Sequence, residues 1–274
     1  MKGNLIFLYL FSTNFFLVVL SFYGPAKEPR NKTISDYAFE LKASKSIKDV
    51  SKEMKKYYSY SLNYILEVMK YKHEHNTLWL EFGVFSGTSI NYISKFTSLH
   101  VYGFDSFEGL PETWRPGYEK SDFDLKGVFP AVNENVRLIK GWYDKSLPPF
   151  LTKHSEKKVS FLHIDCDLYS STIFVLRILA ENNQFARDCV IEFDELFNYD
   201  GFDGNKGELR AWYDFTHEYN VSFSWIGMGS EIDLVGHRVS EEGHPYATGE
   251  QPCALIVHSV SKTASTSTDH NDDV

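Results

Sequence analysis

Residues 78–89, LWLEFGVFSGTS, constrain the fold of this chain more than any other stretch. The apolar run from Leu78 to Phe82 predicts a buried strand that leads into a glycine turn and then into a helix. Gly83 and Gly87 let the backbone approach a ligand where any side chain would obstruct it. Their spacing differs from the G-x-G-x-x-G that follows the first strand of a dinucleotide-binding sheet. The segment therefore predicts an α/β sheet with a binding turn of another kind.

Polar side chains border this turn on both sides. Glu81 closes the strand just before the turn, a position that suits a ligand carrying an amine beside its carboxylate. Thr88 and Ser89 begin the helix, whose unpaired backbone N–H groups and dipole attract a negative group. We therefore expect all three residues to contact the ligand. The alternative is a tight turn that binds nothing.

From residue 78 onward, strand-like and helix-like stretches alternate. This alternation is typical of an α/β fold in which a mostly parallel sheet carries helices on both faces. The expected strands are residues 78–82, 100–105, 136–140, 159–165, 188–194, 221–227 and 253–258. The expected helices are residues 88–97, 145–153, 170–182 and 206–219.

Length, charge and cysteine content limit the class of protein. The 274 residues suffice for one large α/β domain with its own core. A net charge of −9 and the lack of a basic stripe argue against nucleic acid as a partner. The cysteines Cys166, Cys189 and Cys253 form no C-x-x-C pair and lie in or beside apolar runs. We expect buried free thiols rather than a disulfide framework or a zinc site.

Residues 1–25 form an N-terminal hydrophobic segment, in which residues 4–23 carry no charge and are long enough to span a bilayer. We favour a single-pass membrane anchor over a cleaved signal peptide, because the segment is longer than a usual signal core. The lysines and arginine that follow it favour a cytoplasmic C-terminal domain. Glycosylation tripeptides at Asn31 and Asn220 point instead to the secretory pathway.

The rest of the chain divides by composition. Residues 34–76 are polar with apolar positions at helical spacing, which predicts a helical cap beside the sheet or a solvated leader helix. Residues 77–260 form the main domain, in which the polar segment 229–252 predicts a hairpin insertion before the last strand. Residues 261–274 are rich in Ser, Thr and Asp and predict a disordered tail.

The second expected strand ends at Asp105, which is followed by Ser106. Ligands of open α/β sheets bind at the carboxyl ends of the strands. An acid at this position is suited to accept hydrogen bonds from the two hydroxyls of a ribose, and Ser106 is expected to contact the same ligand. A capping aspartate for the following turn is the alternative.

Five runs occur in an order and spacing that resemble those of the TylF/MycF-like methyltransferases, the macrocin O-methyltransferase family. The runs are LEFGVFSGTS, YGFDSFEGLPETW, KGWYDKSLPPFL, FLHIDCDLYSST and FDELFNY. The similarity covers about residues 78–227. It implies a class I methyltransferase fold with an antiparallel last strand and S-adenosyl-L-methionine (SAM) as methyl donor. It also implies a divalent metal, usually Mg²⁺, and methylation of a hydroxyl, often on a sugar.

The resemblance also implies roles for the residues around the cofactor. Glu81, Gly83 and Gly87 would face the methionine end of SAM, and Asp105 would hold the ribose. The residues expected beside the adenine, or alternatively packed under a loop, are Gly141, Trp142 and Tyr143. The segment 112–130 is expected to cover the acceptor; its candidate contact residues are Trp114, Arg115, Tyr118 and Phe123.

Acidic residues follow the fourth and fifth expected strands. Asp165 and Asp167 end one apolar run, and Asp194 and Glu195 end the next. Parallel strands bring their carboxyl ends together, so these acids would converge, and crowded carboxylates require a cation. We expect Asp165, Asp194 and Glu195 to bind Mg²⁺, which prefers oxygen ligands. Helix capping is the alternative, and the resemblance often has two aspartates where Asp194 and Glu195 stand.

Methyl transfer to a hydroxyl needs the acceptor oxygen in line with the methyl group and a base for its proton. We expect Asp165 to act through the metal and Asp167 to be the base, with His163 a poorer candidate because it lies within a strand. Glu192, an acid inside an apolar strand, has no explanation at this level. The expected acceptor is a small-molecule hydroxyl. An NAD(P)-type oxidoreductase and a non-catalytic SAM-binding module remain alternatives, and oligomer formation stays open.

Overall fold

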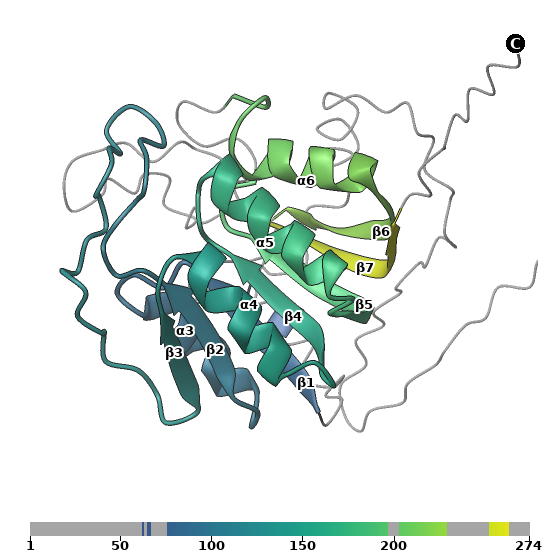
Figure 1. Cartoon of the computed structure of the whole chain (residues 1–274), viewed down its shortest axis with the longest axis horizontal. Coiled ribbons are helices and arrows are strands. Elements are labelled where there is room, and N and C mark those ends of the chain that lie inside the picture. Colours follow the sequence, from purple (N-terminus) through teal and green to yellow (C-terminus); the bar gives the residue numbers. More distant parts are fainter. Residues whose placement is uncertain (1–61, 63–64, 67–75, 197–202, 229–251, 263–274) are drawn as a thin grey trace, which may run out of the picture.

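The computed structural model describes residues 62, 65, 66, 76–196, 203–228 and 252–262. Within them, one seven-stranded sheet has the order β3-β2-β1-β4-β5-β7-β6 (Figure 1). The strands are β1 (Thr77–Phe82), β2 (Val101–Asp105), β3 (Val136–Lys140), β4 (Lys158–Ile164), β5 (Phe185–Phe193), β6 (Tyr219–Met228) and β7 (Cys253–Lys262). Strands β1 to β5 pair in parallel, whereas β7 is antiparallel to both β5 and β6. The predicted α/β fold with an antiparallel last strand is confirmed.

Helices cover both faces of this sheet. Helices α4 (Tyr143–Lys153), α5 (Tyr169–Glu181) and α6 (Gly207–Glu218) lie on one face (Figure 1). The short helix α3 (Thr88–Ile93), which continues as the 3-10 helix η2 (Ser94–Phe96), packs on the other face. The predicted helix over residues 88–97 is therefore shorter and changes type after Ile93.

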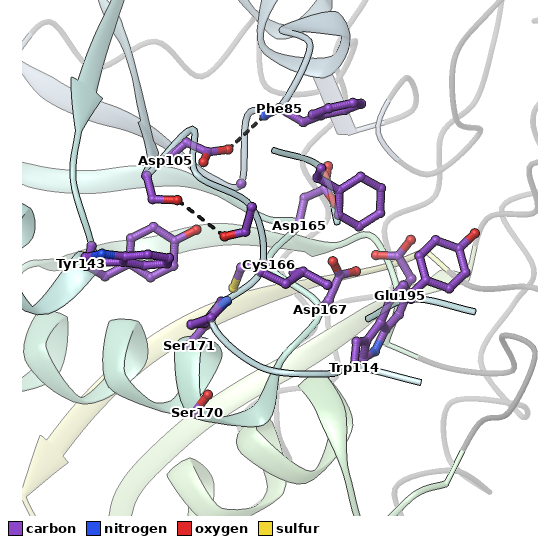
Figure 2. Close-up of a pocket in the computed structure, with 18 of the residues that line it drawn as sticks. Phe85, Asp105, Trp114, Tyr143, Asp165, Cys166, Asp167, Ser170, Ser171 and Glu195 are labelled. Atoms are coloured by element: carbon purple, nitrogen blue, oxygen red, sulfur yellow. Dashed lines mark hydrogen bonds between the residues drawn. The ribbon is translucent and has the colours of Figure 1, made fainter. Parts of the chain in front are cut away.

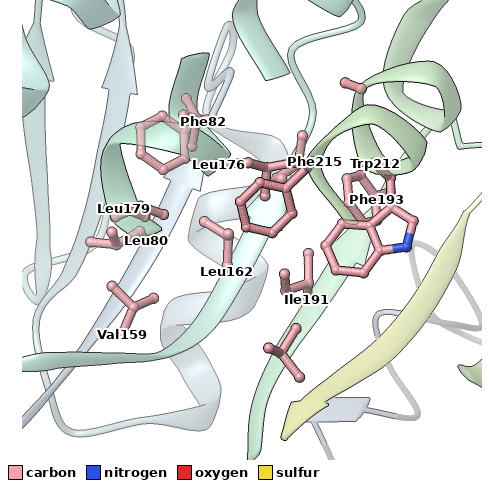
Figure 3. Close-up of a cluster of buried hydrophobic side chains, with 14 of the residues drawn as sticks. Leu80, Phe82, Val159, Leu162, Leu176, Leu179, Ile191, Phe193, Trp212 and Phe215 are labelled. Carbon is pink, nitrogen blue, oxygen red and sulfur yellow. The ribbon is translucent and has the colours of Figure 1, made fainter. Parts of the chain in front are cut away.

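Two apolar clusters hold the helices against the sheet. The cluster under α5 and α6 contains Leu80, Phe82, Leu162, Ile191, Phe193, Trp212 and Phe215 (Figure 3). The cluster on the opposite face joins Trp79 and Phe161 of the sheet to Ile90 and Ile93 of α3. Leu62, Ile65 and Leu66 also belong to it; each is at most 1 % exposed. Side chains alternate along each strand, so odd and even positions of β1 enter different clusters.

Several predictions concern residues outside the described part of the chain. They are the N-terminal hydrophobic segment and most of the leader 34–76, of the insertion 229–252 and of the tail 261–274. The first two residues of the predicted disordered tail, Ser261 and Lys262, are instead the end of a strand, where they pair with Asn220 and Tyr219. Among the described residues, no helix is long and apolar enough to cross a bilayer. The three cysteines are described, and all are buried free thiols, as expected.

Strand boundaries differ from the predicted ones mainly at the antiparallel edge. β5 begins at Phe185, three residues before the predicted start, and β7 continues to Lys262. β4 and β5 are out of register between Val159 and Phe161, and Asp188 has a positive φ of 58° there. A bulge of this kind hides the early part of a strand from a simple alternation pattern.

Candidate active site

A cavity of about 600 Å³ opens at the carboxyl ends of the parallel strands (Figure 2). The ends of β1, β2, β4 and β5 line it, together with the starts of α4 and α5 and the loop after β2. The predicted site residues that line it are Gly83, Asp105, Ser106, Trp142, Tyr143, Asp165, Asp167, Asp194 and Glu195. Glu81, Gly87, Thr88, Ser89 and Gly141 are not among the lining residues. The sheet therefore brings together most, but not all, of the predicted residues.

Gly83 is required where β1 meets β4. Its φ is +89°, and a Cβ atom at this position would lie 1.7 Å from the backbone oxygen of Asp165. The amide of Asp165 donates in turn to the oxygen of Phe82, at 2.9 Å. The glycine turn thus allows a close approach of two backbones at the cavity wall.

The prediction that Glu81 and Ser89 contact the ligand does not agree with their positions. Glu81 is fully buried within the sheet, where its Oε1 accepts a hydrogen bond from Ser89 Oγ at 2.8 Å. Thr88 Oγ1 lies 3.0 Å from Ser86 Oγ on the exposed side of the turn. Glu81 points away from the cavity because odd-numbered positions of β1 face helix α3. Glu81 and Ser89 therefore bond each other.

Asp105 lines the cavity and also caps the neighbouring turns. Its Oδ2 accepts hydrogen bonds from the backbone N–H groups of Val84 and Phe85, both at 2.8 Å, and Figure 2 marks the second. Its Oδ1 accepts from the N–H of Phe107 at 2.7 Å. A carboxylate has about four acceptor sites, so three are in use here. Asp105 therefore caps these turns, as the alternative interpretation expects. A ribose hydroxyl would have to use the remaining acceptor site of its carboxylate.

The residues predicted beside the adenine separate by exposure. Trp142 is 40 % exposed at the cavity, which leaves its ring available for stacking. Tyr143 packs edge-on against Phe82, with ring centroids 5.3 Å apart, and burial raises the pKa of its phenol well above the usual value. Gly141 has a positive φ of 138°, and its N–H donates to the oxygen of Asp105 at 2.9 Å. Gly141 therefore shapes the backbone turn between β3 and α4.

The four predicted acids gather at one end of the cavity and form what we term the acid rim: Asp165, Asp167, Asp194 and Glu195. Figure 2 shows Asp167 and Glu195 there, well apart from Tyr143. One carboxylate oxygen from each of Asp165, Asp194 and Glu195 lies within 4.8 Å of the other two. Strands β4 and β5 are hydrogen-bonded neighbours, which explains the convergence.

Burial dominates the electrostatics of the acid rim. It raises the pKa of Asp165 and of Glu195 well above the usual values, and the charge of Asp194 raises both further. Burial also raises the pKa of Asp167 to about 7, although the Arg115 guanidinium opposes the shift. Burial and mutual repulsion oppose the ionisation of these carboxyl groups. A cation bound between them would therefore stabilise their ionised forms.

The acid rim fits the divalent metal that the resemblance implies. Asp165, Asp194 and Glu195 supply only oxygen ligands, which hard cations prefer. Glu195 Oε2 is buried and accepts no hydrogen bond within the described part of the chain. A buried carboxylate oxygen in this position is costly unless another group, such as a cation, satisfies it.

Glu208 is a fifth acid near the acid rim that the sequence did not reveal. It lies in the first turn of α6 and is fully buried. Burial raises its pKa well above the usual value, followed by the charges of Asp167 and Asp194. Acids are common in the first turn of a helix because the helix dipole stabilises a negative charge there, so Glu208 does not stand out in the sequence. Only the packing of α6 shows that this side chain is enclosed.

The loop after β2 lines the cavity with the rings of Trp114, Tyr118 and Phe123, which we term the aromatic wall. The Arg115 guanidinium lies 4.2 Å from the ring centroid of Trp114 and 4.3 Å from that of Tyr118. A turn at Gly117, with a φ of 86°, brings the two rings to the arginine, and the N–H of Tyr118 donates to the oxygen of Arg115 at 2.8 Å. The predicted contact residues of this loop, Phe123 included, all line the cavity.

A contact outside the wall holds this loop to the helical layer. Ser170 Oγ, at the start of α5, donates to Glu112 Oε1 at 2.6 Å. The loop is therefore tied to α5 on one side and closes the cavity on the other.

A polar row of fully buried residues crosses the sheet beneath the acid rim. It consists of Glu81, His163 and Glu192, in register on β1, β4 and β5, and we term it the core row. His163 Nδ1 lies 3.4 Å from Glu81 Oε2, and His163 Nε2 lies 2.8 Å from Glu192 Oε2. Burial lowers the pKa of His163, but the Glu192 charge and the hydrogen bonds to both carboxylates outweigh it and raise the pKa well above the usual value. Glu192, unexplained by the sequence, is thus the partner of His163.

Comparisons with known proteins find similarity to methyltransferases. The family model described as a methyltransferase domain (Methyltransf_24) matches residues 80–196, and no curated protein matches the sequence. Among solved structures, the chain resembles CalS11, a calicheamicin methyltransferase, with a TM-score of 0.46 and 17 % identity over 71 % of this chain and 76 % of that chain. The O-methyltransferase NovP has a TM-score of 0.42 and 17 % identity over 71 % and 77 % of the two chains.

An O-methyltransferase from Bacillus cereus in complex with SAH has a TM-score of 0.37 and 13 % identity over 81 % of this chain and 87 % of that chain. Scores and identities this low assign neither a substrate nor a metal to the chain. The strand order and the antiparallel β7 are those of a class I methyltransferase. Residues 80–196 therefore resemble a methyltransferase domain, and the described sheet has the strand order of the class I methyltransferase fold.

Proposed function

We propose that this protein transfers the methyl group of SAM to a hydroxyl of a small molecule, with the help of a divalent metal. The observation that carries the proposal is one cavity at the carboxyl ends of the strands. It combines a bare glycine turn, the Asp105 carboxylate and three acids whose oxygens lie within 4.8 Å of one another. Cofactor, metal and acceptor would meet within that single cavity.

SAM would supply the methyl group, which its sulfonium activates for transfer. Gly83 lines the cavity beside the proposed cofactor, and a side chain there would collide with the backbone of Asp165. Asp105 holds the same turn through the backbone N–H groups of Val84 and Phe85, and it holds the loop after β2 through the N–H of Phe107. Trp142 offers a half-exposed ring on which a flat base can stack.

We assign the metal to Asp165, Asp194 and Glu195. A bound Mg²⁺ would supply Lewis-acid stabilisation of an acceptor oxygen as it loses its proton. Asp167 would accept that proton. Its pKa of about 7 suits a general base, because such a group is most effective when its pKa is near the working pH. The charge of Arg115 would favour the ionised form of Asp167 and partly offset the effect of burial.

The acceptor would lie between the acid rim and the aromatic wall. The rings of Trp114, Tyr118 and Phe123 face the cavity from that wall. Flat rings pack well against the C–H face of a sugar or against another ring. The resemblance to macrocin O-methyltransferases favours a sugar hydroxyl as the acceptor.

Formation of SAH from labelled SAM, measured with a panel of sugar and phenolic acceptors, tests the proposal. Turnover should require added Mg²⁺ after EDTA treatment, and Asp194→Asn should abolish turnover while SAH binding is largely retained. Binding of NAD without binding of SAM or SAH in calorimetric titrations would refute the cofactor assignment. Full turnover in EDTA would refute the metal alone.

We further propose that the N-terminal segment anchors the protein in a membrane with its catalytic domain in the cytoplasm. The support is the uncharged run over residues 4–23. The full-length protein should sediment with membranes and resist extraction by high salt. An endoglycosidase-sensitive mobility shift that disappears in Asn220→Gln would place the domain in the secretory lumen and contradict the orientation.

A further inference from the structure

The core row is one of three successive rows that cross β1, β4 and β5 on the same face of the sheet. Farthest from the cavity lies an apolar row of Trp79, Phe161 and Val190, which pair in register. The core row of Glu81, His163 and Glu192 follows, two residues along each strand. Two residues farther on, each strand reaches the cavity at Gly83, Asp165 and Asp194. The sheet thus changes from apolar to ionic one row before the site begins.

Stability alone does not account for the core row. All three of its members are fully buried, so folding transfers three charged or polar side chains out of water, which costs free energy. Replacing a buried ionic group with well-packed apolar residues is often neutral or stabilising. The apolar row just below demonstrates that this face of the sheet accommodates large hydrophobic side chains. The ionic groups therefore need a reason other than packing.

The two ends of the core row lie next to different elements of the proposed site. At one end, Glu81 Oε1 accepts the hydrogen bond from Ser89 Oγ in the helix that follows the glycine turn. At the other, side-chain atoms of His163, Glu192 and Asp194 all lie within 4.8 Å of one another. A series of neighbouring polar side chains therefore runs from the glycine turn to the acid rim.

We propose that His163 is a positioning residue, clamped by Glu81 and Glu192, that orients Asp194 for metal binding and links the glycine turn to the acid rim. This inference rests on the proposed metal site. Outer groups that orient metal ligands commonly change metal affinity by about 10–100-fold when they are replaced. His163 touches neither metal nor acceptor in this assignment and acts only through Asp194.

Mn²⁺ binding to the full-length protein, followed by the electron paramagnetic resonance signal of the free ion, gives a readout that does not depend on activity. His163→Gln should weaken Mn²⁺ binding about tenfold or more, because a neutral amide cannot hold both carboxylates as the imidazole does. Ser89→Ala should also weaken Mn²⁺ binding, by a smaller factor. Ser89 is no metal ligand, so an effect there requires transmission through the core row.

His258→Gln is the matched control, since it makes the same substitution on the same sheet, on β7. It should leave Mn²⁺ binding unchanged. Circular dichroism and SAH titration establish that each variant is folded. If His163→Gln does not fold, Ser89→Ala decides the question.

The outcomes separate the two proposals. Unchanged Mn²⁺ affinity in folded His163→Gln, or in Ser89→Ala where the first variant fails to fold, refutes the positioning role and leaves the metal site intact. If the wild-type protein binds no Mn²⁺, the proposed metal site is wrong, and the positioning role is wrong with it.

Discussion

Two histidine-centred rows cross the same sheet and differ in their partner groups and in their contact with water. In the core row, His163 is held between Glu81 and Glu192 with every side chain fully buried. In the second, which we term the surface row, His258 Nδ1 lies 2.7 Å from Asp188 Oδ1 and His258 Nε2 lies 2.9 Å from Ser224 Oγ. The side chains of His258 and Asp188 are 23 % and 47 % exposed.

The comparison teaches that burial, together with the set of groups, decides what such a row can do. The surface row has the hydroxyl–imidazole–carboxylate order of a nucleophilic triad. Ser224 lies within strand β6, however, and not on a turn that would raise its hydroxyl towards a substrate. We therefore interpret the surface row as a bridge across β5, β7 and β6. If a partner of His258 is removed, water can take its place. Water does not reach the buried partners of His163 in the core row.

The largest difference between the rows should appear when one carboxylate is removed from each. Glu192→Ala should lower the free energy of unfolding by about 3–5 kcal/mol, because it breaks a buried ion pair. Asp188→Ala is the matched variant in the surface row. Urea denaturation of both measures the difference. Losses of equal size would show that burial does not separate the two rows.

Two residues beyond Glu81 of the core row, Gly83 closely approaches the backbone of Asp165. Gly83→Ala should cost about 3 kcal/mol, since overpacking contributes about 1–3 kcal/mol and a left-handed backbone about 1–2 kcal/mol for a residue with a Cβ. Gly127→Ala is the control: its φ is +71°, but its Cβ would meet only the flexible end of Lys140. Equal losses in the two variants, measured by urea denaturation, would contradict a backbone collision.

The acid rim lies beside the core row, and its raised pKa values make the stability of the protein depend on pH. The folded-state pKa of Asp167 is about 7 against an ordinary 3.8, and those of Asp165 and Glu195 are also raised. The folded state then binds more protons than the unfolded state between those values, so stability falls as pH rises. In EDTA, the free energy of unfolding should decrease from about pH 4 to about pH 7.

Denaturant titrations at several pH values test this dependence. Asp167→Asn should flatten the decrease, and added Mg²⁺ should reduce it at neutral pH. Stability that rises with pH across this window in the metal-free protein would contradict the raised pKa values.

The smallest effect is expected for a conservative change in the surface row. Asp188→Asn keeps the shape of the side chain and removes a charge that is half exposed, so it should cost less than about 1 kcal/mol. A thermal melt, repeated at high salt, measures it. A loss of about 2 kcal/mol or more would mean that the surface row carries a greater structural role than its exposure indicates.

Local sequence patterns determined much of this protein. Alternating strands and helices predicted the parallel sheet, and acids at the ends of two strands predicted the acid rim, because the carboxyl ends of parallel strands share one edge. Gly83 was predicted to let the backbone approach a ligand, and the close approach that the structure shows there is to the backbone of Asp165. Such features depend on the order of residues along one strand or turn.

Only the tertiary structure decided which side chains meet across strands. Glu81 was predicted to face the ligand, and its strand position is correct, but it lies opposite His163 in the register of β1 and β4. Glu192 likewise had no explanation until β5 placed it beside His163, and Glu208 became a buried acid only through the packing of α6. Partners of this kind lie tens of residues apart, and their pairing depends on strand register, which a single strand does not encode.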